Sequence, residues 1–297
     1  MINHNFSISL SELAGCPPRD MNCLRSKTAN EIAYAQSQAR RKVSSLKLLE
    51  FFEPWGPFVD GELIKAEPLP LIQSGRFSPK PLIIGTTSEE TVLYIFSAWN
   101  TSVNDLLYGE VVLATYPAHA ISIMNMYPPS DPSDERNEMV KMSTDLVFAC
   151  PTRNATRMMR SQGLTDVWMY VWDHALSFPG WGHVTFCEGR VCHGSEIVYV
   201  FDSAWAGNFT FTPAEDVLSE QIMDFWTNFA KTGNPSDPGR DRHGSGTSRS
   251  SAPKLMWPAY SEEGNWPFFR FNTLTSSVDT NYHGHYCDFW DSVGYAA

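Results

Sequence analysis

A cysteine, a histidine and a glycine follow one another at Cys192, His193 and Gly194, within the stretch R-V-C-H-G-S-E-I-V-Y-V-F of residues 190–201. An imidazole titrates near neutral pH, so a histidine held in an ordered position can act as a general base. The β-branched and aromatic run at residues 197–201 predicts an ordered, buried segment behind this loop, and Gly194 lets the backbone turn sharply. The alternative is a histidine with only a structural, hydrogen-bonded role.

Two acids that could orient such a base lie where a predicted strand ends. Residues 80–85, K-P-L-I-I-G, are expected to form a short buried strand stopped by its glycine, and T-T-S-E-E follows with helix N-cap character. Functional groups collect at strand ends in α/β sheets. An acid that precedes the histidine agrees with the order serine, acid, histidine of α/β-hydrolases. In those enzymes the acid orients the imidazole, which takes the proton of the serine.

The elements that must position these groups alternate along the chain. Helices are expected over residues 9–50, 91–126 with interruptions, 141–150 and 216–231, the last ended by G-N-P, and residues 167–173 are the strongest strand prediction. Residues 237–254, rich in Gly, Ser and Arg, predict a flexible surface loop. Strands separated by long helical segments predict an α/β fold with a mostly parallel sheet.

Composition narrows the class of protein further. The 297 residues, 42% of them hydrophobic, can bury a sizeable core, and the net charge of −11 argues against a nucleic-acid partner. No apolar run approaches the roughly 20 residues of a membrane span. Six cysteines, an even number, are consistent with three disulfides and so with an oxidising compartment. Four N-x-S/T sequons, at Asn5, Asn100, Asn154 and Asn208, agree with such a compartment. The N-terminus has no signal-peptide features, and we interpret this mismatch as a missing N-terminal part.

Several longer motifs resemble one family, the type B carboxylesterases, which include the cholinesterases. The resemblance covers nearly the whole chain but only the C-terminal half of the family. The histidine motif H-G-x-E-I/L-x-x-V-F is matched from His193 onward, and the family's acidic loop places Glu90 at the position of the catalytic acid. The other matching motifs are D-L-V-F-A-C-P at residues 145–151, Y-V-W-D-H at residues 170–174 and F-W-T-N-F-A-K-T-G-N-P at residues 225–235.

The resemblance implies a fold and a set of site residues. The fold would be an incomplete α/β-hydrolase fold, a single partial domain over residues 1–297 in which parallel strands and flanking helices remain and the N-terminal strands are missing. Glu90 would be the catalytic acid and His193 the base, while Glu89 is expected to be a solvated neighbour. Phe178 and Trp181 would line the substrate pocket. The implied disulfides are Cys16–Cys23, Cys150–Cys287 and Cys187–Cys192.

The nucleophile of the family has no counterpart in this sequence. A nucleophile elbow, G-x-S-x-G, needs two glycines four residues apart, and none of the nineteen glycines form such a pair. The glycine-rich oxyanion segment is absent too, and neither Ser195 nor Ser88 has the context to replace the serine. We therefore expect the C-terminal portion of a secreted carboxylic ester hydrolase, inactive by itself. Its partners would be a small-molecule ester and the missing N-terminal half, with no cofactor and no metal.

Two alternatives remain from other functional classes. The first is a catalytically inactive, cholinesterase-like adhesion or structural module, although the presence of both Glu90 and His193 argues against it. The second is a zinc site formed by Cys187, Cys192 and His193 with His183 or with the cluster His283, His285 and Cys287. These spacings fit no standard zinc site.

Overall fold

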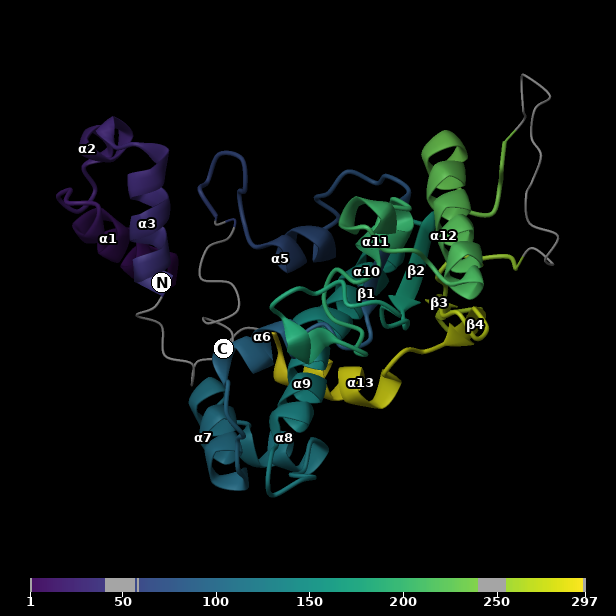
Figure 1. Ribbon diagram of the computed structural model, residues 1–297. Coiled ribbons are helices and arrows are strands. Elements are labelled where there is room, and N and C mark those ends of the chain that lie inside the picture. Colours follow the sequence, from purple (N-terminus) through teal and green to yellow (C-terminus); the bar gives the residue numbers. More distant parts are fainter. Residues whose placement is uncertain (1, 41–56, 58, 240–254, 296–297) are drawn as a thin grey trace. The chain divides into compact units, whose positions relative to one another are not determined.

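The computed structural model describes residues 2–40, 57, 59–239 and 255–295. This part of the chain, drawn as coloured ribbon in Figure 1, divides into two compact units. The helical unit contains Met1–Glu67 and Thr101–Glu135, and the sheet unit contains Pro68–Asn100 and Arg136–Tyr295. Both members of the predicted acid–base pair therefore belong to the sheet unit.

The helical unit is held locally by caps and by one disulfide. Its described helices are α1 (Ile2–Leu13), α2 (Met21–Ser26), α3 (Ala29–Arg40), α7 (Asp105–Thr115) and α8 (Ala120–Met126). The Cys16–Cys23 disulfide closes the turn between α1 and α2. Within that turn the side chain of Asp20 accepts a hydrogen bond of 2.9 Å from the backbone N–H of Cys23, which caps α2.

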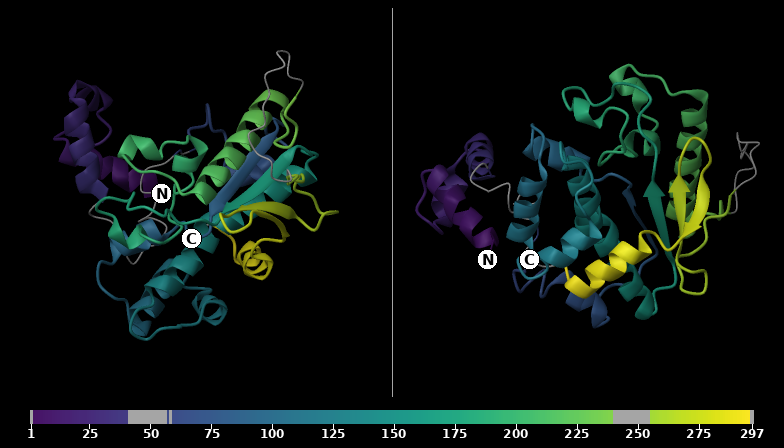
Figure 2. Two further views of the ribbon diagram at one scale, coloured as in Figure 1. Left: turned by 45° about the vertical axis from the view of Figure 1, so that its right-hand side comes forward. Right: turned by 90° about the horizontal axis from the view of Figure 1, so that it is seen from below.

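The sheet unit is organised around a mixed sheet whose strands follow in the order β1 (Leu82–Thr87), β2 (Val167–Trp172), β3 (Pro267–Phe271) and β4 (Ser277–Thr280). Strands β1, β2 and β3 run parallel, and β4 is antiparallel to β3 (Figure 2). Strand β2 is buried almost throughout. This burial explains its continuous apolar sequence, V-W-M-Y-V-W, because a central parallel strand has no solvent-facing side.

Helices cover both faces of this sheet. The helices of the sheet unit are α5 (Pro68–Gln73), α6 (Val92–Ala98), α9 (Arg136–Thr144), the π-helix η1 (Asp145–Ala149), α10 (Cys150–Ser161), the 3₁₀-helices η2 (Thr185–Cys187) and η3 (Ala204–Gly207), α11 (Ile197–Val200), α12 (Pro213–Thr232) and α13 (Gly284–Val293). Trp168 and Trp172 of β2 pack in one core with Phe225 of α12. The alternate residues Val167 and Met169 pack in a second core that includes residues of η1 and α10, as the period of two in a strand requires.

Several predicted elements are confirmed. The strand predicted at residues 167–173 is β2, and the helix predicted at residues 216–231 is α12. Helix α12 begins earlier, at Pro213, because Thr212 and Glu215 form a reciprocal capping box. It ends at Gly233, whose φ of 79° is left-handed, as a glycine C-cap allows.

Other predictions are wrong in detail. Gly85 does not stop the first strand, because β1 continues to Thr87 in register with β2. The run at residues 197–201 contains the short helix α11, and within this run Ile197 and Phe201 are exposed while Tyr199 is buried. Strands β3 and β4 were not predicted, since they are only five and four residues long.

Two predicted segments lie wholly or partly outside the described residues. Of the loop predicted at residues 237–254, positions 240–254 are not described, and neither are positions 41–50 of the predicted N-terminal helical region. Among the helices that the structure describes, none combines the length and apolar character needed to cross a bilayer.

Candidate active site

Glu90 is buried in the turn that follows β1. Only 4% of the residue is exposed, and its Oε1 atom accepts a 2.7 Å hydrogen bond from the backbone N–H of Thr87, the last residue of β1. The turn thus presents a carboxylate at the carboxyl end of a parallel strand, where α/β sheets carry their functional groups. Because one oxygen is fixed by the backbone, the other oxygen has a defined direction.

That second oxygen contacts His193. The distance between Glu90 Oε2 and His193 Nδ1 is 2.6 Å. The imidazole lies on the loop after Cys192, and Gly194 beside it has a φ of 81°. The side chain of His193 is 44% exposed, whereas that of Glu90 is 6% exposed. In this arrangement the enclosed carboxylate fixes the orientation of the imidazole through Nδ1, as the acid of an acid–base pair must do.

Two aromatic rings flank the imidazole. Tyr94 of α6 and Phe148 of η1 have ring centroids 5.7 and 5.4 Å from that of His193. The Tyr94 and Phe148 rings also stack on each other, with centroids 6.1 Å apart. Sequence reasoning missed both residues, because neither motif marks an aromatic neighbour of the histidine. Their position limits the rotation of the His193 side chain, since interior side chains pack closely.

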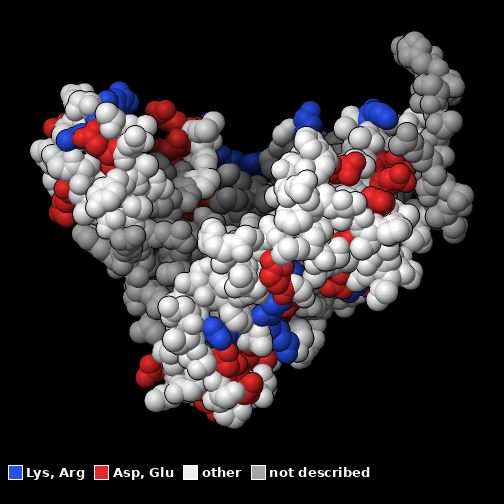
Figure 3. Space-filling view, viewed as in Figure 1, with Lys and Arg blue, Asp and Glu red and all other residues white. Residues whose placement is uncertain are grey.

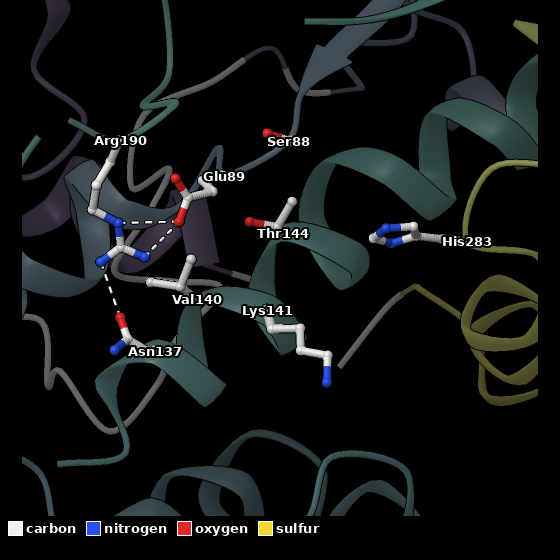
Figure 4. A pocket seen from close by; sticks show the side chains of 8 residues that line it. All are labelled: Ser88, Glu89, Asn137, Val140, Lys141, Thr144, Arg190 and His283. Carbon is white, nitrogen blue, oxygen red and sulfur yellow. Dashed lines mark hydrogen bonds and ion pairs between the residues drawn. The ribbon is translucent and has the colours of Figure 1, made fainter. Parts of the chain in front are cut away.

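Glu89 is not the solvated neighbour that was expected. Its carboxylate forms an ion pair with Arg190, with a distance of 2.6 Å between Glu89 Oε1 and Arg190 Nη2. Glu89 and Arg190 also line a pocket of about 560 Å³, shown in Figure 4. The remaining lining residues of this pocket are Ser88, Asn137, Val140, Lys141, Thr144 and His283.

The groups next in sequence to His193 are buried. The hydroxyl of Ser195 and the Oε2 atom of Glu196 are both buried, and neither has a hydrogen-bond partner among the described residues. Burial and the nearby Glu90 carboxylate raise the pKa of Glu196 above its usual value of 4.5. The Ser195 hydroxyl therefore forms no hydrogen bond with His193, and the exclusion of Ser195 as the nucleophile stays a prediction.

Of the two residues predicted to line a substrate pocket, Phe178 lies among other aromatic side chains. Phe178 stacks on Phe209 with ring centroids 4.9 Å apart and packs against the core on the α12 face. The Nε1 atom of Trp181 is buried without a hydrogen-bond partner among the described residues. A substrate-lining role for Phe178 and Trp181 stays a prediction.

The structure contains the three predicted disulfides, Cys16–Cys23, Cys150–Cys287 and Cys187–Cys192. The cysteines of the alternative zinc set are thus oxidised and cannot supply thiolate ligands. Among the described residues, no three His, Cys, Asp or Glu side chains are grouped so that they could hold a metal ion.

The predicted glycosylation sites differ in accessibility. Asn100 and Asn208 are exposed. The Nδ2 atom of Asn154 donates a 2.7 Å hydrogen bond to Asp291. The side chain of Asn5 lies outside the described residues.

On the face shown in Figure 3, Lys and Arg side chains are dispersed among Asp and Glu side chains.

The sequence model of the carboxylesterase family matches residues 3–290, nearly the whole chain. The chain belongs to the carboxylesterase family. Two solved structures, a PNB esterase and a thermophilic PNB esterase, superpose on the chain with TM-scores of 0.70 and 0.69 at 22% identity. The superpositions cover 97% and 95% of this chain, and 53% and 52% of the two solved chains, respectively. The fold is thus an incomplete α/β-hydrolase fold, as predicted.

Relatives of this carboxylesterase family member are longer. The chain is 28% identical over 297 residues to the Crystal protein of Dictyostelium discoideum, covering 99% of this chain and 52% of the relative. It is 31% identical over 223 residues to the cAMP-regulated D2 protein of the same organism, covering 74% of this chain and 41% of that relative. It is 27% identical over 255 residues to the pyrethroid hydrolase Ces2a of Mus musculus, covering 78% and 42%. The chain spans about half the length of the curated relatives it matches.

Proposed function

We propose that this chain supplies the acid and the base of a carboxylic ester hydrolase whose serine nucleophile and oxyanion-hole donors lie outside these 297 residues. The hydrogen bond between Glu90 and His193 carries the proposal. Membership of the carboxylesterase family supports it, and so does the lack of a G-x-S-x-G motif in this sequence. In this proposal residues 1–297 form one partial carboxylesterase domain.

The reaction is acyl transfer from a small-molecule carboxylic ester. The Nε2 atom of His193 takes the proton of the serine hydroxyl as the serine oxygen attacks the ester carbonyl, and Glu90 stabilises the resulting imidazolium. The alcohol leaves with that proton. Water then attacks the acyl-serine in the same way, the carboxylic acid is released, and the serine regains its proton. No cofactor takes part in these steps.

Without a nucleophile the isolated chain should be inactive. Removing the nucleophile of a catalytic triad leaves only the residual rate provided by binding and the oxyanion hole, and the latter also needs donors that this sequence lacks. The disulfides and exposed sequons further support a secretory-pathway location for the protein that contains this chain.

A fluorophosphonate probe, which reacts with activated serines, tests the proposal. An antibody against this chain would be used to isolate the native protein. We expect the probe to label a polypeptide longer than 297 residues, with the labelled peptide outside this sequence, and to leave the purified 297-residue chain unlabelled. Stoichiometric labelling of a serine in the purified chain would overturn the proposal.

The second candidate is an inactive cholinesterase-like adhesion or structural module. The missing elbow motif favours it, while the close Glu90–His193 contact favours the hydrolase. Here the native protein would bind no fluorophosphonate and would not hydrolyse p-nitrophenyl acetate, whatever its length.

A further inference from the structure

Glu89, which the proposed reaction does not use, holds the loop that carries His193. Its Oε1 atom accepts hydrogen bonds from Nε and Nη2 of Arg190, at 3.0 and 2.6 Å. Its Oε2 atom accepts a 2.9 Å hydrogen bond from the backbone N–H of Val191. Both carboxylate oxygens therefore act on two consecutive residues of one loop, and bonds with a charged partner are stronger than neutral ones.

Arg190 is fixed from two further elements. Its Nη1 atom donates a 2.9 Å hydrogen bond to Asn137 of α9, as Figure 4 shows. Its guanidinium lies 5.2 Å from the ring centroid of Phe96 of α6. Only 23% of the Arg190 side chain is exposed, so the guanidinium has a defined place against the protein.

A disulfide carries this constraint towards the histidine. Cys187 and Cys192 are buried and form a bridge that encloses Arg190 and Val191 within a short loop. His193 directly follows Cys192 in the chain. Because the disulfide leaves this short loop little conformational freedom, a displacement of the Arg190 or Val191 backbone also displaces the imidazole of His193.

We propose that Glu89 is a positioning residue, which anchors Arg190 and Val191 so that His193 Nδ1 remains within hydrogen-bond distance of Glu90. This inference rests on the proposed role of His193 as the base. Two adjacent acids therefore bind one loop at two points. Glu89 accepts hydrogen bonds from Arg190 and Val191, and Glu90 contacts the imidazole of His193. A misplacement of about 1 Å in a catalytic group can reduce a rate about a hundredfold, so a second anchor matters for function.

The test is an NMR measurement on the full chain labelled with ¹⁵N-histidine. The Nδ1 proton of an imidazole bonded to a carboxylate resonates far downfield, and H193Q identifies its signal. In E89A we expect this proton to exchange with solvent about tenfold faster or more, because the charged hydrogen bonds that hold the loop are lost. R190A should give a smaller increase, since Glu89 still accepts the Val191 N–H, and R190K should lie between R190A and the wild type.

D279A is the matched control. Arg270 and Asp279 form an ion pair of similar exposure in the same unit, with 2.7 Å between Arg270 Nε and Asp279 Oδ2, but they link β3 and β4. If Glu89 served only general stability, D279A and E89A variants with equal losses of Tm would show equal exchange rates. That result, or an unchanged exchange rate in E89A, would overturn the positioning role. A wild-type spectrum without the downfield proton would instead contradict the proposed acid–base pair itself.

Discussion

Gly85 of β1 and Tyr170 of β2 lie opposite each other in the parallel ladder. A Cβ atom built on Gly85 would lie 2.3 Å from Cδ1 of Tyr170 and 2.4 Å from its backbone oxygen. The strand that leads to Glu90 can therefore approach β2 at this point only because residue 85 has no side chain.

G85A should destabilise the sheet unit. The Tyr170 ring could rotate away, but the backbone oxygen cannot, and such overpacking costs about 1–3 kcal/mol. We expect this loss in the free energy of unfolding, measured in urea. G109A is the contrasting variant, because Gly109 lies within α7 and, apart from its chain neighbours and the backbone of its own helix, no atom lies within 4 Å of an added Cβ. G109A should be stabilising by about 0.5–1 kcal/mol, and equal effects of the two substitutions would contradict the close contact.

E90Q should remove most of the proposed esterase activity of the protein that contains this chain. The amide keeps the size of the side chain but favours the wrong tautomer of His193, and a comparable replacement in a Ser-His-Asp triad lowers kcat about 10⁴-fold. The hydrolysis of p-nitrophenyl acetate by the native-length protein measures this loss. E110Q, which alters an exposed acid of α7, should leave kcat unchanged. Wild-type activity in E90Q would show that Glu90 is not the orienting acid.

Glu215 should make folding sensitive to acid. Burial favours the protonated carboxyl, but hydrogen bonds from Ser177, Tyr199 and His174 outweigh it and lower the pKa of Glu215 from 4.5 to about 2. The ionised carboxylate thus contributes about 3 kcal/mol above pH 4.5, and this contribution is lost as the pH falls from 4.5 towards 2.

Urea unfolding of E215Q at several pH values checks this prediction. The difference in unfolding free energy between wild type and E215Q should be largest near neutral pH and should shrink below pH 4.5. D216N provides the control, since Asp216 is exposed in the same helical turn and should contribute no more than about 1 kcal/mol. A difference between wild type and E215Q that is constant across pH would contradict the lowered pKa.

The two disulfides of the sheet unit should differ in their contribution to stability. Cys150–Cys287 joins residues 137 positions apart, whereas Cys187–Cys192 joins residues 5 positions apart. In the loop-entropy model the long bridge restricts the unfolded chain by about 5 kcal/mol and the short bridge by about 2 kcal/mol. Unfolding in urea of the double variants C150A/C287A and C187A/C192A measures both values, and a larger loss for the short bridge would contradict the entropic account.

The sequons should be used unequally when the chain is expressed through a secretory pathway. Asn208 is exposed, whereas the Nδ2 atom of Asn154, which would carry the glycan, donates a hydrogen bond to Asp291 in the folded chain. We expect N208Q to remove one glycan mass and N154Q to leave the mass of the attached glycans unchanged. Treatment with an endoglycosidase supplies the unglycosylated reference, and a loss of mass in N154Q would contradict the prediction.

The sequence by itself determined the features that depend on neighbouring residues. The strand β2 follows from its continuous apolar run, and the ends of α12 follow from its capping residues and glycine. These patterns extend over only a few residues, so they can be recognised in the sequence without knowledge of the fold. The histidine and acidic-loop motifs likewise named His193 and Glu90 as a pair, and the absence of an elbow motif is a property of the sequence alone.

Tertiary structure alone decided which groups meet across long distances in the chain. Glu89 and Arg190 are 101 residues apart, and no local pattern marks them as partners, because their contact depends on where β1 ends relative to the loop of His193. The same reason applies to Tyr94 and Phe148 beside the imidazole. The run at residues 197–201 was predicted to be buried from its residue types, but burial depends on what packs against a segment. In α11 only Tyr199 is fully buried, while Val198 and Val200 pack against the core and remain partly exposed.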